Sequence, residues 1–198
     1  MSEPATKRAT YDDLYSIPDN MTGEIINGEL IVTPRPSRIH VMASSYLGAE
    51  LIPPYCHGRG GGPGGWVILI EPEIKLGEHI IVPDLAGWKK ERFPDEEPHN
   101  WISVPPDWIC ETLSPGTRRL DRMIKMPIYA QHEVPYLWLV DPAEKTLEVF
   151  RLKEGEWVVA GLFLDNAKVR AEPFTGIELS LGDLWRETRS PSTEVPKE

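Results

Sequence analysis

Short apolar segments separated by tight turns are the feature that most constrains the fold of this chain. Residues 24–33 hold two such segments on either side of Asn27-Gly28, and this dipeptide between apolar segments is a strong signal for a β-hairpin. Residues 73–82 have the same form around a Gly-Glu pair. The predicted strands cover residues 24–26, 29–33, 66–70, 73–76, 79–82 and 107–113, followed by the segments YLWLVD, TLEVFRL and EWVVAG. The pattern predicts a domain that contains antiparallel hairpins.

Helical spacing of apolar residues alternates with these strands. In residues 37–51, the apolar residues Ile39, Met42, Tyr46 and Leu47, followed by Ala49 or Glu50, lie near helical spacing. Pro53 and Pro54 are expected to stop the helix. The predicted helices cover residues 10–16, 37–51 and about 118–132. Helices among strands indicate an α/β or α+β fold.

The third predicted helix has an apolar stripe and a proline. Leu120, Ile124 and Ile128 are expected to form its buried stripe, with Lys125 at the border. Pro127 removes a backbone donor within the helix, so we expect a kink there.

Length and composition are those of one globular domain. The chain has 198 residues, of which 40% are hydrophobic and 26% are charged. We expect a single domain over residues 1–185 and a disordered polar tail over residues 186–198. No apolar run is long enough to cross a bilayer, residues 1–10 lack the core of a signal peptide, and the two cysteines have no zinc-site spacing. A cytoplasmic protein with no membrane partner is expected.

The charge balance argues against a general polyanion binder. The formal net charge is −10, whereas nucleic-acid-binding proteins usually present a basic face. One local cluster runs the other way, because Arg118, Arg119, Arg122 and Lys125 lie within eight residues. Within a Debye length of about 8 Å, nearby charges matter more to a ligand than the net charge of the chain. This cluster is therefore compatible with a nucleic-acid substrate.

Glu111 stands out in the segment DWICETL. Period-two alternation places Ile109, Glu111 and Leu113 on one face of the predicted strand. A carboxylate between two aliphatic side chains is costly to bury unless it is paired or bound to metal. The alternative is a half-buried face from which Glu111 reaches solvent. We favour the functional interpretation, because perturbed buried acids concentrate at sites.

Asp84 follows the apolar segment 79–82 and comes directly after Pro83. By itself it is as well explained as an aspartate in a turn. Its significance rises because a hairpin strand ending in Pro-Asp, followed by a strand that carries a glutamate, is the core of the PD-(D/E)XK nuclease pattern. Asp84 and Glu111 together therefore predict a pair of metal ligands.

Five segments carry a family resemblance, in the same order along the chain: EIINGEL, the His40 that opens a helix after PRPSR, IIVPDLAGW, ETLSPGTRRLDRMIK and VPYLWLVDP. They resemble the Uma-two group of restriction endonuclease-like proteins, within the PD-(D/E)XK nuclease superfamily, over most of residues 11–182. The resemblance implies an α/β (α+β) fold of restriction-endonuclease type, with a mixed central sheet flanked by helices and additional antiparallel hairpins. It also implies a nuclease site that uses Mg²⁺ or Mn²⁺.

The lysine of the nuclease motif is displaced in this chain. In the usual arrangement it lies two residues after the acid, where this chain has Leu113. In the resembled group the next helix supplies the lysine, and Lys125 matches that position. A border lysine can lay its methylene stem over the core and direct its amine to the sheet edge. The alternative is a weak i,i+4 pair between Asp121 and Lys125. The kink at Pro127 either turns the lysine away from the site or re-aims it.

Four further residues are possible accessories to the site. Glu24 matches an acid typical of the group, or is an exposed strand acid. His40 would touch a phosphate or polarise water, although a lone histidine on a helix is more often structural. Glu73 would help to bind metal, or belongs to a solvated strand face. Tyr129 would donate a hydrogen bond near the site, or belongs to an interface or to the core.

These expectations combine into a divalent-metal-dependent endonuclease that cleaves phosphodiester bonds in DNA. Asp84 and Glu111 would be the metal ligands, Lys125 the cation beside the reacting phosphate, and the three arginines at 118, 119 and 122 the contacts to flanking phosphates. A homodimer is expected, because two cuts on a duplex suit two-fold symmetry. The alternatives are an inactive nuclease fold retained as a binding module and a hydrolase of a small phosphorylated substrate.

Overall fold

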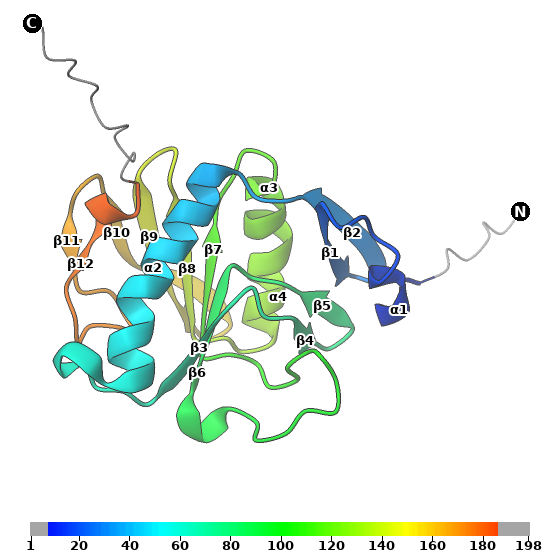
Figure 1. The fold of residues 1–198 in the computed structure, drawn as a ribbon, viewed down its shortest axis with the longest axis horizontal. Helices are drawn as coiled ribbons and strands as arrows, with labels where there is room; N and C mark the ends of the chain where they lie inside the picture. The colour runs from blue at the N-terminus through cyan, green and yellow to red at the C-terminus, as the bar shows by residue number, and fades with distance from the viewer. Residues whose placement is uncertain (1–7, 186–198) are drawn as a thin grey trace, which may run out of the picture.

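The computed structural model describes residues 8–185 (Figure 1). The predicted tail, residues 186–198, lies outside the described residues. No helix within residues 8–185 combines the length and the apolar composition needed to cross a membrane.

A six-stranded mixed sheet forms the centre of the fold, with the strand order β10-β9-β8-β7-β6-β3. Its strands are β3 (Trp66–Ile70), β6 (Leu85–Lys89), β7 (Trp108–Thr112), β8 (Tyr136–Asp141), β9 (Thr146–Lys153) and β10 (Glu156–Leu164). Strands β7 and β8 are parallel, and every other neighbouring pair is antiparallel. The parallel pair needs a crossover, which a helical segment between β7 and β8 provides.

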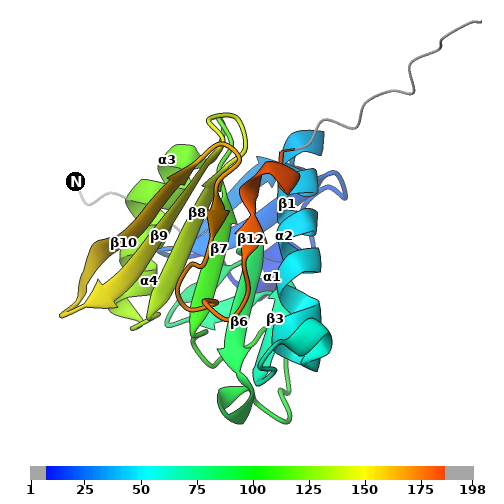
Figure 2. The same cartoon turned by 90° about the vertical axis from the view of Figure 1, so that its left-hand side faces the viewer.

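Helices cover both faces of this sheet (Figures 1 and 2). One face packs against α2 (Arg38–His57), whose Leu47 and Leu51 share one core cluster with Trp108 and Trp138 of the sheet. The other face packs against a continuous helical segment between β7 and β8. This segment consists of α3 (Arg118–Leu120), the π-helical turn η3 (Asp121–Lys125) and α4 (Met126–Gln131).

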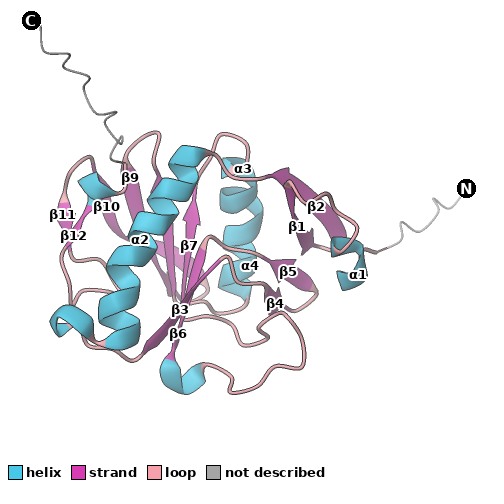
Figure 3. Ribbon diagram, in the orientation of Figure 1, coloured by secondary structure: helices cyan, strands magenta, loops and turns pink. Residues whose placement is uncertain are grey.

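A second, four-stranded sheet has the order β2-β1-β5-β4 and lies beside α4 (Figure 3). Its strands are β1 (Met21–Ile26), β2 (Glu29–Pro34), β4 (Ile74–Leu76) and β5 (His79–Ile81). Both predicted hairpins are present. Asn27 and Gly28 have φ angles of 55° and 77°, as a two-residue turn of type I′ requires. The expected mixed central sheet with flanking helices and additional hairpins is therefore confirmed.

Smaller elements complete the described chain. They are α1 (Tyr11–Leu14), β11 (Lys168–Val169), β12 (Leu179–Ser180) and the 3₁₀ turns η1 (Arg59–Gly61), η2 (Lys90–Arg92) and η4 (Leu181–Asp183). The expected helix at residues 10–16 is reduced to α1, where the Thr10 backbone N–H donates to the Asp13 carboxylate at 2.7 Å. Strand β6, which starts directly after Asp84, was not predicted.

The expectation that Pro53 and Pro54 end helix α2 is wrong. The helix continues to His57 and stops at Gly58, which has a φ of 63°. Its buried stripe continues through Leu51 and Tyr55, so core packing outweighs the loss of two backbone donors. The buried face also differs from the expectation. Of the residues at helical spacing, Leu47 is buried, whereas Ile39 and Tyr46 are exposed. The buried stripe contains His40, Ala43, Ser44, Leu47, Gly48, Leu51 and Tyr55.

The helical segment after β7 also departs from the predicted stripe. Ile124 is 39% exposed, whereas Asp121 and Lys125 are each 3% exposed. The π turn is the physical reason, because its wider hydrogen-bond register rotates the following residues relative to an α-helix. The irregularity expected at Pro127 lies just before it, in this turn, and Pro127 occupies the first turn of α4, where its missing donor is tolerated.

Candidate active site

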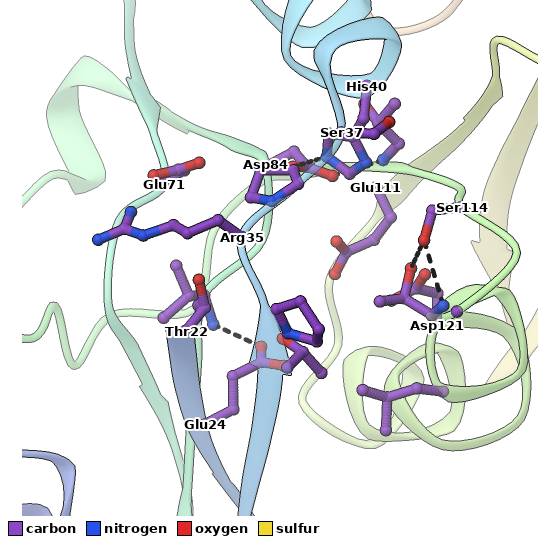
Figure 4. A pocket seen from close by; sticks show the side chains of 18 of the residues that line it. Thr22, Glu24, Arg35, Ser37, His40, Glu71, Asp84, Glu111, Ser114 and Asp121 are labelled. Atoms are coloured by element: carbon purple, nitrogen blue, oxygen red, sulfur yellow. Dashed lines mark hydrogen bonds and ion pairs between the residues drawn. The ribbon is translucent and has the colours of Figure 1, made fainter. Parts of the chain in front are cut away.

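A cavity of about 350 Å³ lies where the two sheets, the start of α2 and the π turn meet (Figure 4). Residues far apart in the sequence share its lining, among them Glu24 from β1, His40 from α2, Asp84 before β6, Glu111 from β7 and Lys125 from the π turn. The structure therefore brings the three predicted catalytic residues to one cavity. It also brings there two of the four predicted accessories, Glu24 and His40.

Glu111 is 3% exposed and lies on the face of β7 that carries Ile109 and Leu113, as the alternation predicted. Its Oε1 accepts a hydrogen bond from the Tyr129 hydroxyl. The same oxygen lies 2.9 Å from Lys125 Nζ. Tyr129 is fully buried and reaches the site through this hydrogen bond.

Burial dominates the electrostatics of Glu111. Loss of solvent raises the pKa of Glu111 to about 8, although the nearby Lys125 ammonium acts in the opposite direction. The carboxylates of Asp121, Asp84 and Glu24 add to the rise in this pKa. Negative charge at this point is thus compensated only in part by the side chains around it.

Asp84 is held by contacts to both of its carboxylate oxygens. The backbone N–H of Thr112, next to Glu111 in the chain, donates to Asp84 Oδ2 at 2.6 Å. His40 Nε2 lies 2.5 Å from Asp84 Oδ1. These contacts fix Asp84 at the end of β7, beside Glu111, and make His40 a positioning partner of the aspartate.

Lys125 lies among three buried carboxylates. Its Nζ is 2.9 Å from Glu111, 3.0 Å from Glu24 and 3.7 Å from Asp121. Burial alone lowers the pKa of this lysine, but the surrounding carboxylates outweigh burial and hold the pKa of Lys125 well above its ordinary value. The side chain is therefore a fixed cation and not a proton acceptor at neutral pH.

Glu24 ties the smaller sheet to the site. Its Oε1 accepts the backbone N–H of Val82 at 2.8 Å and also contacts Lys125. With 5% exposure it is buried, so the alternative of an exposed strand acid is wrong.

Asp121 is a residue of the cavity that sequence reasoning treated only as a partner of Lys125 in a weak i,i+4 pair. It is 3% exposed, and burial raises its pKa while Lys125 opposes the rise. A spacing of four residues before a candidate catalytic lysine was the available signal. This spacing did not predict burial, because the apolar periodicity of the sequence does not reveal the π turn that directs Asp121 and Lys125 into the cavity.

The remaining predicted residues lie elsewhere. Glu73 does not line the cavity, and it accepts a hydrogen bond from the Tyr11 hydroxyl. Arg118 pairs with Asp141, Arg122 pairs with Glu148, and Arg119 is exposed. Two of the three arginines expected to hold phosphates are thus engaged by acids of the sheet.

The donor set suits a hard cation. Among residues 8–185, no group of three or more His, Cys, Asp or Glu side chains is arranged to hold a metal ion. Mg²⁺, however, is commonly bound through one or two carboxylates, with waters and substrate phosphates completing its shell. Asp84 and Glu111 provide the two carboxylates, and the Thr112 hydroxyl is buried at the cavity without a hydrogen-bond partner. These residues fit such an ion.

The mixed sheet and the cluster of carboxylates and lysine at the end of β7 define a restriction-endonuclease-like protein. The chain belongs to the Uma2 family, described as "Putative restriction endonuclease", whose family model matches residues 8–182. The family resemblance seen in the sequence is confirmed.

A solved structure supports the same class. The chain is similar to a protein from Anabaena variabilis ATCC 29413 whose crystal structure at 1.96 Å is described as "a putative nuclease belonging to DUF820". The two share 26% sequence identity with a TM-score of 0.71, over 89% of this chain and 97% of that chain. No curated protein matches this chain significantly.

Proposed function

We propose that this protein is a divalent-metal-dependent endonuclease that hydrolyses phosphodiester bonds in DNA. The observation that carries the proposal is the convergence of Asp84, Glu111 and Lys125 at one cavity, with Lys125 Nζ 2.9 Å from Glu111. Membership of the Uma2 family, described as "Putative restriction endonuclease", supports the same reaction.

In this proposal Asp84 and Glu111 hold Mg²⁺ or Mn²⁺. Polarisation of the phosphate and activation of water are the chemistry that the cation supplies when bound. Four carboxylates, those of Glu24, Asp84, Glu111 and Asp121, line a cavity that contains the ammonium of Lys125. Uncompensated buried charge is costly, so a divalent cation is the expected complement of this donor set.

Lys125 acts as an electrostatic group. Its ammonium is held by surrounding carboxylates and would neutralise negative charge that develops on the phosphate in the transition state. His40 positions Asp84, and Tyr129 positions Glu111, each through a direct contact. Glu24 positions Lys125 from the smaller sheet.

The test uses supercoiled plasmid and circular single-stranded DNA, each incubated with Mn²⁺. Wild-type protein should cleave at least one of them, with no cleavage in EDTA and recovery when Mn²⁺ is restored in excess. Asp84→Asn and Lys125→Gln should each slow cleavage at least about a hundredfold, the usual size of a lost transition-state contact. Both substitutions keep hydrogen-bonding groups but remove a buried charge, so each variant is assayed below its own unfolding temperature.

Matched controls separate the site from general charge effects. Asp95→Ala and Lys90→Ala change exposed residues that do not line the cavity, and both should cleave like wild type. Thermal unfolding would verify that all variants are folded at the assay temperature. Cleavage that survives in folded Asp84→Asn and Lys125→Gln would refute the assigned roles.

Failure to cleave either DNA would refute the endonuclease proposal. Hydrolysis of bis(p-nitrophenyl) phosphate without cleavage of DNA would instead indicate the small-substrate hydrolase. Absence of both reactions, with DNA still bound, would indicate the inactive binding module.

A further inference from the structure

The candidate catalytic groups lie below the molecular surface. Glu111 and Lys125 are each 3% exposed, and Glu24 is 5% exposed. A phosphodiester must therefore enter the cavity to reach them. The volume of about 350 Å³ is at the small end of the range of about 300–1,000 Å³ for small-molecule pockets.

Two short segments form walls of this cavity. One is residues 33–37, which cover the end of β2 and the link to α2, and the other is residues 114–117, between β7 and α3. Pro34, Pro36 and Pro115 give these walls apolar surface. This proline surface can contact the faces of a base or a sugar. Polar side chains of the same segments, among them Arg35, Ser37 and Ser114, can contact a DNA strand through hydrogen bonds.

The charges around the cavity are unfavourable for a duplex. Binding to duplex DNA draws its affinity from several phosphate contacts made by Lys and Arg. Arg35 lines the cavity itself. Outside its lining, Arg118 and Arg122 are paired with Asp141 and Glu148, and the net charge of the whole chain is −10. The predicted basic cluster therefore offers the phosphates of a rigid duplex fewer unpaired arginines than the sequence suggested.

From the depth of the candidate catalytic groups and the proline surface beside them, we propose that the substrate is single-stranded DNA, or an unpaired end or flap, of which one nucleotide enters the cavity. This inference rests on the proposed nuclease function. In a duplex, a phosphate is fixed at the surface of a stiff double helix. A flexible strand can instead bend a phosphate and its nucleoside into the cavity. A duplex would first have to unpair and unstack, which costs a few kcal/mol.

Four end-labelled oligonucleotides of one sequence test this proposal: a single strand, a blunt duplex, a duplex with an unpaired flap and a duplex with a central bubble. With Mn²⁺, the single strand, the flap and the bubble should each be cut at least about tenfold faster than the blunt duplex, because unpairing costs more than the roughly 1.4 kcal/mol that corresponds to tenfold. Cuts in the flap and the bubble should map to unpaired nucleotides.

A second variant tests entry into the cavity itself. A Cβ at Gly116 would meet only Ser114 Oγ, at 3.9 Å, so this wall accepts a larger side chain. Gly116→Tyr should slow cleavage of the single strand by about tenfold or more, the effect of about 1.4 kcal/mol of lost access. Ala49→Tyr, on the exposed side of α2, should have no effect.

The outcomes separate this inference from the proposed function. Equal rates on the single strand and the blunt duplex would overturn the inference and leave the nuclease standing. An unchanged rate in a folded Gly116→Tyr variant would also overturn it. Failure to cut any of the four oligonucleotides would refute the nuclease function on which the inference rests.

Discussion

At the scale of single residues, Lys125 joins carboxylates from three different elements. Its Nζ lies 2.9–3.7 Å from Glu111, Glu24 and Asp121. Breaking a buried ion pair by removing one partner is strongly destabilising, because the remaining charge loses its compensation. The same lysine is thus assigned both to the proposed reaction and to the stability of the fold.

Lys125→Met is expected to lower the free energy of unfolding by about 3–5 kcal/mol, the usual effect of breaking a buried pair. Urea unfolding followed by circular dichroism at pH 7 would measure it. Adding Asp121→Asn to Lys125→Met should recover part of the loss, because one uncompensated carboxylate is removed. A loss below about 1 kcal/mol, the value of an exposed pair, would contradict the ionic network.

His79 gives the smaller sheet a dependence on pH. It is 6% exposed, and its Nδ1 accepts the backbone N–H of Asn27 at 3.1 Å, which requires the neutral ring. Burial lowers the pKa of His79 from 6.5, opposed by Glu78 and reinforced by His132. As the pH falls below about 6.5, His79 is therefore protonated in the unfolded chain before it is protonated in the folded chain. The free energy of unfolding decreases as a result.

We expect the free energy of unfolding to decrease between pH 7 and pH 5, and to decrease less in His79→Gln. Glutamine can accept the same N–H without titrating. Urea unfolding at several pH values, with the exposed His99→Gln as control, would measure the difference. The same slope in wild type and in His79→Gln would rule out this origin of the pH dependence.

At the scale of elements, the first hairpin is determined by its local sequence, whereas the π turn is not. The turn between β1 and β2 follows from Asn27-Gly28, whose φ angles of 55° and 77° these residue types tolerate. The π turn follows from no such signal. The apolar spacing of Leu120, Ile124 and Ile128 predicted a regular helix with Ile124 inside, but Ile124 is 39% exposed.

Gly28→Ala tests how far the turn stabilises the smaller sheet. A Cβ costs about 1–2 kcal/mol in the left-handed region, so the free energy of unfolding should fall by that amount. Gly116→Ala, at a glycine without positive φ and with open space around it, should change stability by less than about 0.5 kcal/mol. Equal effects of the two substitutions in urea unfolding would contradict the role of backbone conformation.

At the scale of the whole molecule, one edge of the central sheet is unusually apolar. Strand β10 is the last strand in the order, and it exposes Val159 by 61%, Leu162 by 60% and Leu164 by 53%. A long apolar edge strand favours pairing with a second strand. This surface would serve the homodimer expected from the sequence.

We expect light scattering to give a molar mass of about twice the 22.4 kDa of one chain. Val159→Lys combined with Leu162→Lys should return the mass of a monomer, because charge on an edge strand opposes edge pairing. Lys substitutions at two exposed positions of the loop after η2 would be the control. A monomeric wild-type protein would contradict the expected dimer.

The sequence by itself determined the features that depend on near neighbours. Alternation placed Glu111 on one face of β7 with Ile109 and Leu113, and turn chemistry placed the two hairpins, because strand period and turn conformation are local properties. The segment resemblance then identified the fold, the family and the candidate residues Asp84, Glu111 and Lys125.

Only the tertiary structure decided which side chains contact the candidate site residues. The burial of Asp121 with Lys125 depends on one π turn. Arg118 pairs with Asp141, and Glu73 accepts a hydrogen bond from Tyr11 away from the cavity, which are contacts between residues distant in the chain. Periodicity carries no information on such contacts, because they arise from the way the two sheets and the helical segment close on one another. For that reason the sequence predicted a nuclease-like site, and the structure showed that its acids and lysine lie inside a small cavity.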